Sequence, residues 1–195
     1  MVHVTEENLS IVDTDLLIRE CINASGGENA FAYIVSPFIS DYKVPSGAIS
    51  FASNIVSISD VDFFTDLVRL LARELQGAQN TTSVYIVCNS PNELANQGMR
   101  SSFVREQKRV LLKFQEMDCD VRINNDLHAK ATVTSSGALF GSFNLTTSGR
   151  FYNEELGSLI VKNGDEKNDE YLQKQEWAKE KFDNGKPLTE QHLDI

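Results

Sequence analysis

The sequence predicts a layered α/β domain, in which helices flank a β-sheet. The chain has 195 residues, which suffices for one domain with a sizeable core and is short for two ordinary domains joined by a linker. Its composition, 41% hydrophobic with 11 Gly and 4 Pro, is typical of a folded protein rather than a disordered or collagen-like one. Short apolar runs alternate with longer segments of helical periodicity, as in α/β proteins. We therefore expect a single domain over residues 1–195.

The first elements are a helix and a buried strand. Residues 13–23 predict a helix that ends near Gly26 and Gly27, and the apolar run 31–36 predicts a strand that Pro37 closes.

Residues 40–59 are the least distinct part of the chain. Pro45 and Gly47 indicate a turn there, with possible short strands at 48–51 and 54–58.

The next helix is better defined, because apolar residues recur at helical spacing from position 61 onward. We expect Ser59 or Asp60 to cap its N-terminus and Gly77 to end it after Gln76. Residues 83–88 then predict another buried strand.

A third helix, over residues 102–117, has an apolar face and a basic face. The basic face is either an ordinary solvated surface or a surface that attracts phosphate, and the second interpretation makes Arg105 and Arg109 candidate substrate-binding residues. The apolar positions are Phe103, Val110, Leu111, Phe114 and Met117, and the basic ones are Arg105, Lys108, Arg109 and Lys113.

The remaining chain predicts four short strands, a helix and a tail. Turns separate three of the strands, and the last part, from about residue 163, is strongly acidic; there we expect a helix over residues 165–182 and a loose tail. The expected strands cover 120–123, 127–134, 138–142 and 156–161.

The charge argues against a protein that binds nucleic acid by its overall charge. Eighteen basic and 28 acidic residues give a net charge of −10. Basic residues outnumber acidic ones only locally, over residues 100–130, so contact with a polyanion must be local.

A cytoplasmic protein without stable membrane association is expected. The apolar runs are far shorter than the roughly 20 residues of a membrane-spanning helix, and no signal peptide is recognisable. Cys21, Cys88 and Cys119 are widely spaced, which favours reduced, structural thiols over disulfides or a zinc site.

Candidate catalytic residues begin at His128. Alternation in a strand places His128 and Lys130 on one face, where an imidazole can attack phosphorus and an ammonium can offset the charge that develops. After a turn at 136–137, the next strand would bring Ser142 and Asn144 close to His128.

Asn153 and Glu155 complete the set. A carboxylate such as Glu155 can fix the tautomer of an imidazole, and Asn153 is a candidate for substrate binding. Each residue alone has an ordinary structural interpretation, but the joint spacing favours a phosphate-handling site. A serine triad of Ser142 and His128 is an alternative, although the Gly-x-Ser-x-Gly elbow is absent.

These motifs resemble the signature of the phospholipase D superfamily. The resemblance is carried by three segments, and the run 33–39 is also similar to the first strand of that fold. One position departs: the family motif has an Asp, mainly structural, five residues after the Lys, where this chain has Ser135. The matching segments are His128-x-Lys130, Gly141-Ser142-x-Asn144 and Asn153-x-Glu155-Leu-Gly157.

The resemblance implies a metal-independent phosphodiesterase without cofactors. Family members use two such motifs, in which one histidine forms a covalent phosphohistidine and the other protonates the leaving oxygen. Because this chain has one motif, the resemblance implies a homodimer with His128 of both copies at one phosphate, Lys130 and Asn144 binding that phosphate, and Glu155 orienting a His128.

The substrate class stays open at this point. Short members with one motif resemble nucleases, and DNA is the expected substrate ahead of RNA. The alternatives are a phospholipase or phosphatidyltransferase, and a non-catalytic member that uses the fold for binding.

Overall fold

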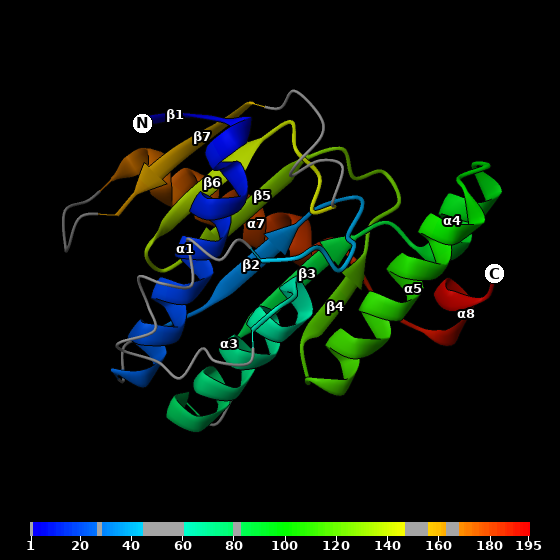
Figure 1. The fold of residues 1–195 in the computed structure, drawn as a ribbon, viewed down its shortest axis with the longest axis horizontal. Helices are drawn as coiled ribbons and strands as arrows, with labels where there is room; N and C mark the ends of the chain where they lie inside the picture. The colour runs from blue at the N-terminus through cyan, green and yellow to red at the C-terminus, as the bar shows by residue number, and fades with distance from the viewer. Residues whose placement is uncertain (1, 27–28, 45–60, 80–82, 147–155, 163–167) are drawn as a thin grey trace.

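The protein is described by a computed structural model in which helices cover both faces of a mixed β-sheet (Figure 1). The structure describes residues 2–26, 29–44, 61–79, 83–146, 156–162 and 168–195. The strands are β1 (Val2–Thr5), β2 (Ala32–Val35), β3 (Val84–Cys88), β4 (Asp120–Ile123), β5 (Lys130–Thr134), β6 (Gly137–Gly141), β7 (Leu156–Val161) and β8 (Lys186–Pro187). The helices are α1 (Glu6–Ser25), α3 (Phe64–Gln79), α4 (Pro91–Asn96), α5 (Ser101–Glu116), α7 (Asp169–Asp183) and α8 (Glu190–Leu193).

The order of the strands brings several strand ends to one edge of the sheet. Over the described residues the order is β1-β7-β6-β5-β2-β3-β4-β8, with β2, β3 and β4 parallel and β5 antiparallel to β2. The last residue of β2, Val35, lies opposite Ala131, and the first residue of β5, Lys130, lies opposite Gly141 at the end of β6. We call this edge, where β2, β3, β4 and β6 end and β5 and β7 begin, the carboxyl edge.

Each face of the sheet has its own apolar core. In Figure 1, α1, α3 and α5 lie in front of the sheet and α7 lies behind it. The front core includes fully buried Leu17, Phe64 and Phe114, one from each of these helices. The back core places Tyr171 and Phe182 of α7 among residues of β2 and β5. Among the described helices, none has the length and apolarity that a membrane span requires.

The N-terminal part of the chain is more regular than expected. Helix α1 begins at Glu6 rather than near residue 13, and β1 precedes it. Strand β1 pairs antiparallel with β7, with Val2 opposite Leu159. A four-residue edge strand whose partner lies more than 150 residues away has no local pattern that marks it.

The second long helix starts later and ends later than expected. The predicted start at Ser59 or Asp60 is wrong, because α3 begins at Phe64. Its first turn is fixed from outside the helix, since the Thr65 N–H donates to Asp41 Oδ1 at 2.9 Å. Gly77 does not end the helix, which continues to Gln79. The strands expected at 48–51 and 54–58 lie outside the described residues.

The expected loose tail is wrong as well. Strand β8 pairs with β4, and the side chain of Leu193 in α8 is buried in the front core. A capping box between Thr189 and His192 begins α8. The acidic helix α7 begins at Asp169 rather than residue 165, after Asn168 caps it.

Candidate active site

His128 lies in the loop before β5, at the carboxyl edge. Strand β5 begins at Lys130, three residues later than expected, so His128 is outside the strand and its side chain is exposed. The Lys130 Nζ donates to the His128 carbonyl oxygen at 2.8 Å. The lysine thus contacts the main chain of His128 and not its imidazole, which remains exposed to a substrate.

Gly141 allows β6 and β7 to approach each other beside Lys130. A Cβ at this position would overlap the carbonyl oxygen of Leu156, so a side chain would push the two strands apart. The expected strand through Ser142 is wrong by one residue, because β6 ends at Gly141. Ser142 nevertheless extends the pairing: its N–H donates to the Leu156 oxygen at 3.1 Å, and its Oγ accepts from the Leu156 N–H at 3.2 Å.

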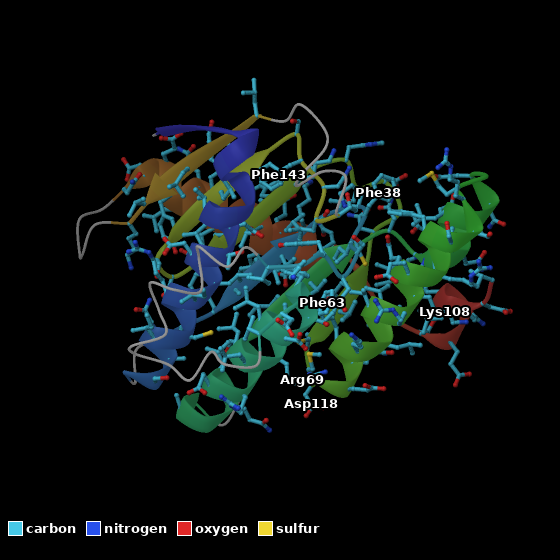
Figure 2. All side chains as sticks on the ribbon, in the orientation of Figure 1. Phe38, Phe63, Arg69, Lys108, Asp118 and Phe143 are labelled. Carbon is cyan, nitrogen blue, oxygen red and sulfur yellow. The ribbon has the colours of Figure 1, made fainter. Side chains whose placement is uncertain are left out.

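Asn144 lies between two buried residues at the same edge. Phe143 and Leu145 are each 1% exposed, and Leu145 is anchored because its N–H donates to Ser36 Oγ at 3.1 Å. The Asn144 Oδ1 is buried without a hydrogen-bond partner in the described part of the chain. A buried acceptor without a partner costs free energy, which a donor on a bound ligand would recover. Figure 2 labels Phe143 and Phe38, which follow the ends of β6 and β2 at this edge.

The structure thus brings four of the predicted residues, His128, Lys130, Ser142 and Asn144, to one edge of the sheet. Asn153 and Glu155 lie outside the described residues.

The basic face of α5 is partly neutralised by acidic residues. The Arg109 Nη2 lies 2.7 Å from a Glu106 carboxylate oxygen and 3.5 Å from Asp41, and the hydrogen bond to Glu106 raises the pKa of Arg109. Lys113 Nζ lies 2.8 Å from Asp41. Arg105 is exposed and has no ion pair among the described residues. The basic pattern in the sequence therefore overstates the positive charge that α5 offers to a substrate.

Asp41 is the centre of this neutralisation. Burial alone would raise the pKa of its carboxyl, but hydrogen bonds from Lys113 and Thr65 outweigh burial and lower that pKa. A carboxylate that is ionised and nearly buried holds the cations around it in place.

Sequence reasoning missed Glu20, which supports the turn between β5 and β6. Its side chain is fully buried and accepts hydrogen bonds from the Phe31 N–H at 2.7 Å, Ser135 Oγ at 2.9 Å and Ser136 Oγ at 3.3 Å. Burial raises the pKa of Glu20. Ser135 stands where the resembled motif has an Asp, so at this turn the carboxylate comes from α1 instead.

Sequence reasoning also missed a pocket beside the motif. It has a volume of about 300 Å³ and opens between α7 and the ends of β5 and β6. Lys174 and Trp177 of α7 line it together with Lys130. The sequence predicts that Lys174 and Trp177 lie on one helix, but it does not indicate which strands that helix packs against.

Comparison with known proteins agrees with this geometry at the level of the fold. No protein-family model and no curated protein matches the sequence. A solved structure does match: Nuc, a phospholipase D family member from Salmonella typhimurium, has a TM-score of 0.52 over 86% of this chain and 88% of its own. The chain has the phospholipase D fold. At 14% identity the likeness concerns the arrangement of helices and strands, and it confirms the fold that the motifs implied.

A second solved structure, the archaeal chromatin protein TrmBL2, matches with a TM-score of 0.49 and 11% identity. This chain is covered to 96% and TrmBL2 to 53%.

Proposed function

We propose that the protein is a metal-independent phosphodiesterase that cleaves DNA through a covalent phosphohistidine, with an active site shared by two copies of the chain. The observation that carries the proposal is an exposed imidazole, His128, at the same edge of the sheet as Lys130 and Asn144 on a phospholipase D fold. An exposed nucleophile, a cation and a hydrogen-bonding amide at one edge suit phosphoryl transfer, which depends on positioning and on stabilisation of charge.

The chemistry proceeds in two displacements. A ring nitrogen of His128 attacks phosphorus, a P–N bond forms, and the P–O bond to the leaving nucleotide breaks as that oxygen takes a proton from the second imidazole. Water then attacks the phosphohistidine, the P–N bond breaks, and the second imidazole receives the proton that the water loses. The Lys130 ammonium and the amide nitrogen of Asn144 donate hydrogen bonds to the phosphoryl oxygens, and Glu155 orients a His128.

The second imidazole comes from a second copy of the chain. Of the chain's three histidines, His192 is occupied in the cap of α8, where its Nδ1 accepts from the Thr189 N–H at 3.1 Å, and His3 lies on the edge strand β1. A two-fold dimer places both copies of His128 at one phosphate. Leu156, 70% exposed and bonded to Ser142, supplies apolar surface at the same edge for such an interface.

Two features extend the proposal to substrate contact and cellular location. Arg105 is exposed on α5 and remains a substrate-binding candidate together with Asn153, whereas Arg109 is held by Glu106. The three thiols are buried, and burial raises the pKa of each to about 12, which supports unreactive, reduced cysteines. Free thiols of this kind are compatible with the cytoplasmic location that we propose.

The decisive experiment is cleavage of labelled single-stranded DNA and plasmid in the presence of EDTA. We expect wild-type protein to cut and His128→Ala to be inactive, because the covalent step needs the imidazole. His192→Ala is the matched control and should cut like wild type. Cleavage by His128→Ala, or loss of cleavage in EDTA, would overturn the mechanism.

An active site shared by two chains also requires that the protein is a dimer in solution. Light scattering should give about twice the chain mass of 21.8 kDa at micromolar concentration. Mixing His128→Ala with wild-type chains should lower activity beyond simple dilution, since mixed dimers lack one imidazole. An active, strict monomer contradicts the proposal.

A further inference from the structure

The pocket beside the motif shares Lys130 with the candidate active site. Among the residues that the structure describes, its lining consists of Ala129, Lys130, Phe140, Gly141, Lys174 and Trp177. Ala129 and Lys130 belong to the first motif segment, and Gly141 belongs to the second. A group bound in this pocket therefore lies beside Lys130, the residue that the proposed function assigns to the phosphate.

The pocket is positively charged in an acidic protein. The chain carries a net charge of −10, yet the described residues that line the pocket include two lysines and no carboxylate. The Lys174 Nζ lies 4.2 Å from the centre of the Phe140 ring, and no ion pair joins Lys174 or Lys130 to a carboxylate in the described ranges. Among the described residues, therefore, no carboxylate competes with an anionic ligand for these two ammonium groups.

The pocket also offers aromatic surface. Trp177 is half-buried and packs against the back core, and Phe140 faces the pocket from β6. Aromatic rings beside lysines form the arrangement with which proteins bind single-stranded nucleic acid: bases stack on the rings and phosphates contact the cations.

The size of the pocket limits what it can hold. A volume of about 300 Å³ is at the lower end of small-molecule sites, so it accommodates one nucleotide-sized group. A base in a duplex is already stacked on both faces and must leave the helix before it can stack on Trp177.

We infer that this pocket binds a nucleobase next to the scissile phosphate, with stacking on Trp177 and the neighbouring phosphate on Lys174, so that the protein acts on single-stranded DNA in preference to duplex. The inference rests on the proposed nuclease function and adds to it a base-binding subsite and a strand preference.

Binding can be measured without catalysis, because Trp177 is the single tryptophan of the chain. Its fluorescence should be quenched saturably by deoxyadenosine monophosphate, which contains no phosphodiester to cleave. Deoxyribose 5-phosphate, which lacks the base, should bind at least tenfold more weakly. Equal binding of the two compounds, or no quenching by either, would overturn the base-binding subsite.

Variants test the same pocket during cleavage. We expect Trp177→Ala to lower kcat/KM on single-stranded DNA roughly 5- to 150-fold, because stacking contributes about 1–3 kcal/mol per base. Trp177→Phe keeps an aromatic ring and should lose less, and Lys174→Gln should raise KM with the packing of α7 intact. Lys179→Gln, on the exposed side of the same helix and paired with Asp183, is the control and should match wild type.

The two levels of the hypothesis fail separately. Quenching by the mononucleotide without any DNA cleavage would remove the nuclease function and keep the pocket as a nucleotide site. Cleavage that is equally fast on single strands and duplex and unaffected by Trp177→Ala would remove the base-binding subsite and keep the nuclease.

Discussion

At the scale of single residues, Glu20 shows how the turn between β5 and β6 is held without the motif Asp. Glu20→Ala removes the acceptor for the Phe31 N–H and for the hydroxyls of Ser135 and Ser136. We expect the free energy of unfolding to fall by about 1–3 kcal/mol, the cost of leaving partly buried donors without this acceptor. Urea denaturation measures it. Glu20→Gln keeps the shape and one acceptor oxygen, and should lose less.

The same residue predicts a pH dependence. Burial raises the pKa of Glu20 above its ordinary 4.5, so the folded state binds the proton more tightly than the unfolded state. The contribution of Glu20 to stability is therefore fully present below pH 4.5 and is lost as the pH rises through the folded-state pKa. The stability of wild type relative to Glu20→Gln should decrease over that range, and an increase would contradict the assignment.

The candidate site separates what local spacing can predict from what it cannot. His128 and Lys130 are two residues apart, and the short turn after β5 returns the chain to Gly141 opposite Lys130, so their proximity follows from the sequence alone. The contact of Glu20 with Ser135 spans 115 positions, and no local pattern indicates it. The pocket lysine, Lys174, was hidden for the same reason.

At the scale of elements, the placement of α5 depends on Gln107. This side chain is fully buried; its Nε2 donates to the carbonyl oxygens of Asn89 at 2.7 Å and Pro37 at 3.3 Å, and its Oε1 accepts from the Ile39 N–H at 3.3 Å. The helix is thereby attached to the loops that follow β2 and β3 at the carboxyl edge.

Gln107→Ala should destabilise the protein by about 3 kcal/mol or more, because it leaves these backbone groups unpaired. Chemical denaturation gives the value. Gln115→Ala on the exposed face of the same helix is the control and should change stability by less than about 0.5 kcal/mol. Equal effects of the two variants would mean that Gln107 does not anchor α5.

Elements with strong local periodicity were predicted closely, and those fixed by distant contacts were not. The predicted helix over 102–117 is α5 (Ser101–Glu116), and the predicted strand over 83–88 is β3 (Val84–Cys88). The start of α3 depends on Asp41, which is distant in sequence from that helix. Likewise β8 exists because it pairs with β4.

At the scale of the whole molecule, the distribution of charge matters more than its sum. The net charge of −10 repels a polyanion, and Asp41 and Glu106 neutralise cations of α5 that the sequence offers. What remains near His128 is a small positive region, Lys130 and Lys174. Attraction to DNA should therefore be short-ranged and carried by few contacts.

The number of these contacts can be measured from the salt dependence of DNA binding. Each phosphate neutralised on a single strand contributes about −0.7 to the slope of log affinity against log salt concentration, so the two lysines of the pocket contribute about −1.4 per protomer, or about −2.8 in a dimer. Fluorescence titration of His128→Ala with single-stranded DNA over a range of salt concentrations gives this slope without cleavage.

The Lys174→Gln substitution should reduce the magnitude of the slope by about 0.7 per protomer. Arg109→Gln should leave the slope unchanged, because Glu106 and Asp41 already pair with that guanidinium. A steeper slope that falls with Arg109→Gln and not with Lys174→Gln would place the DNA along α5 instead of the pocket.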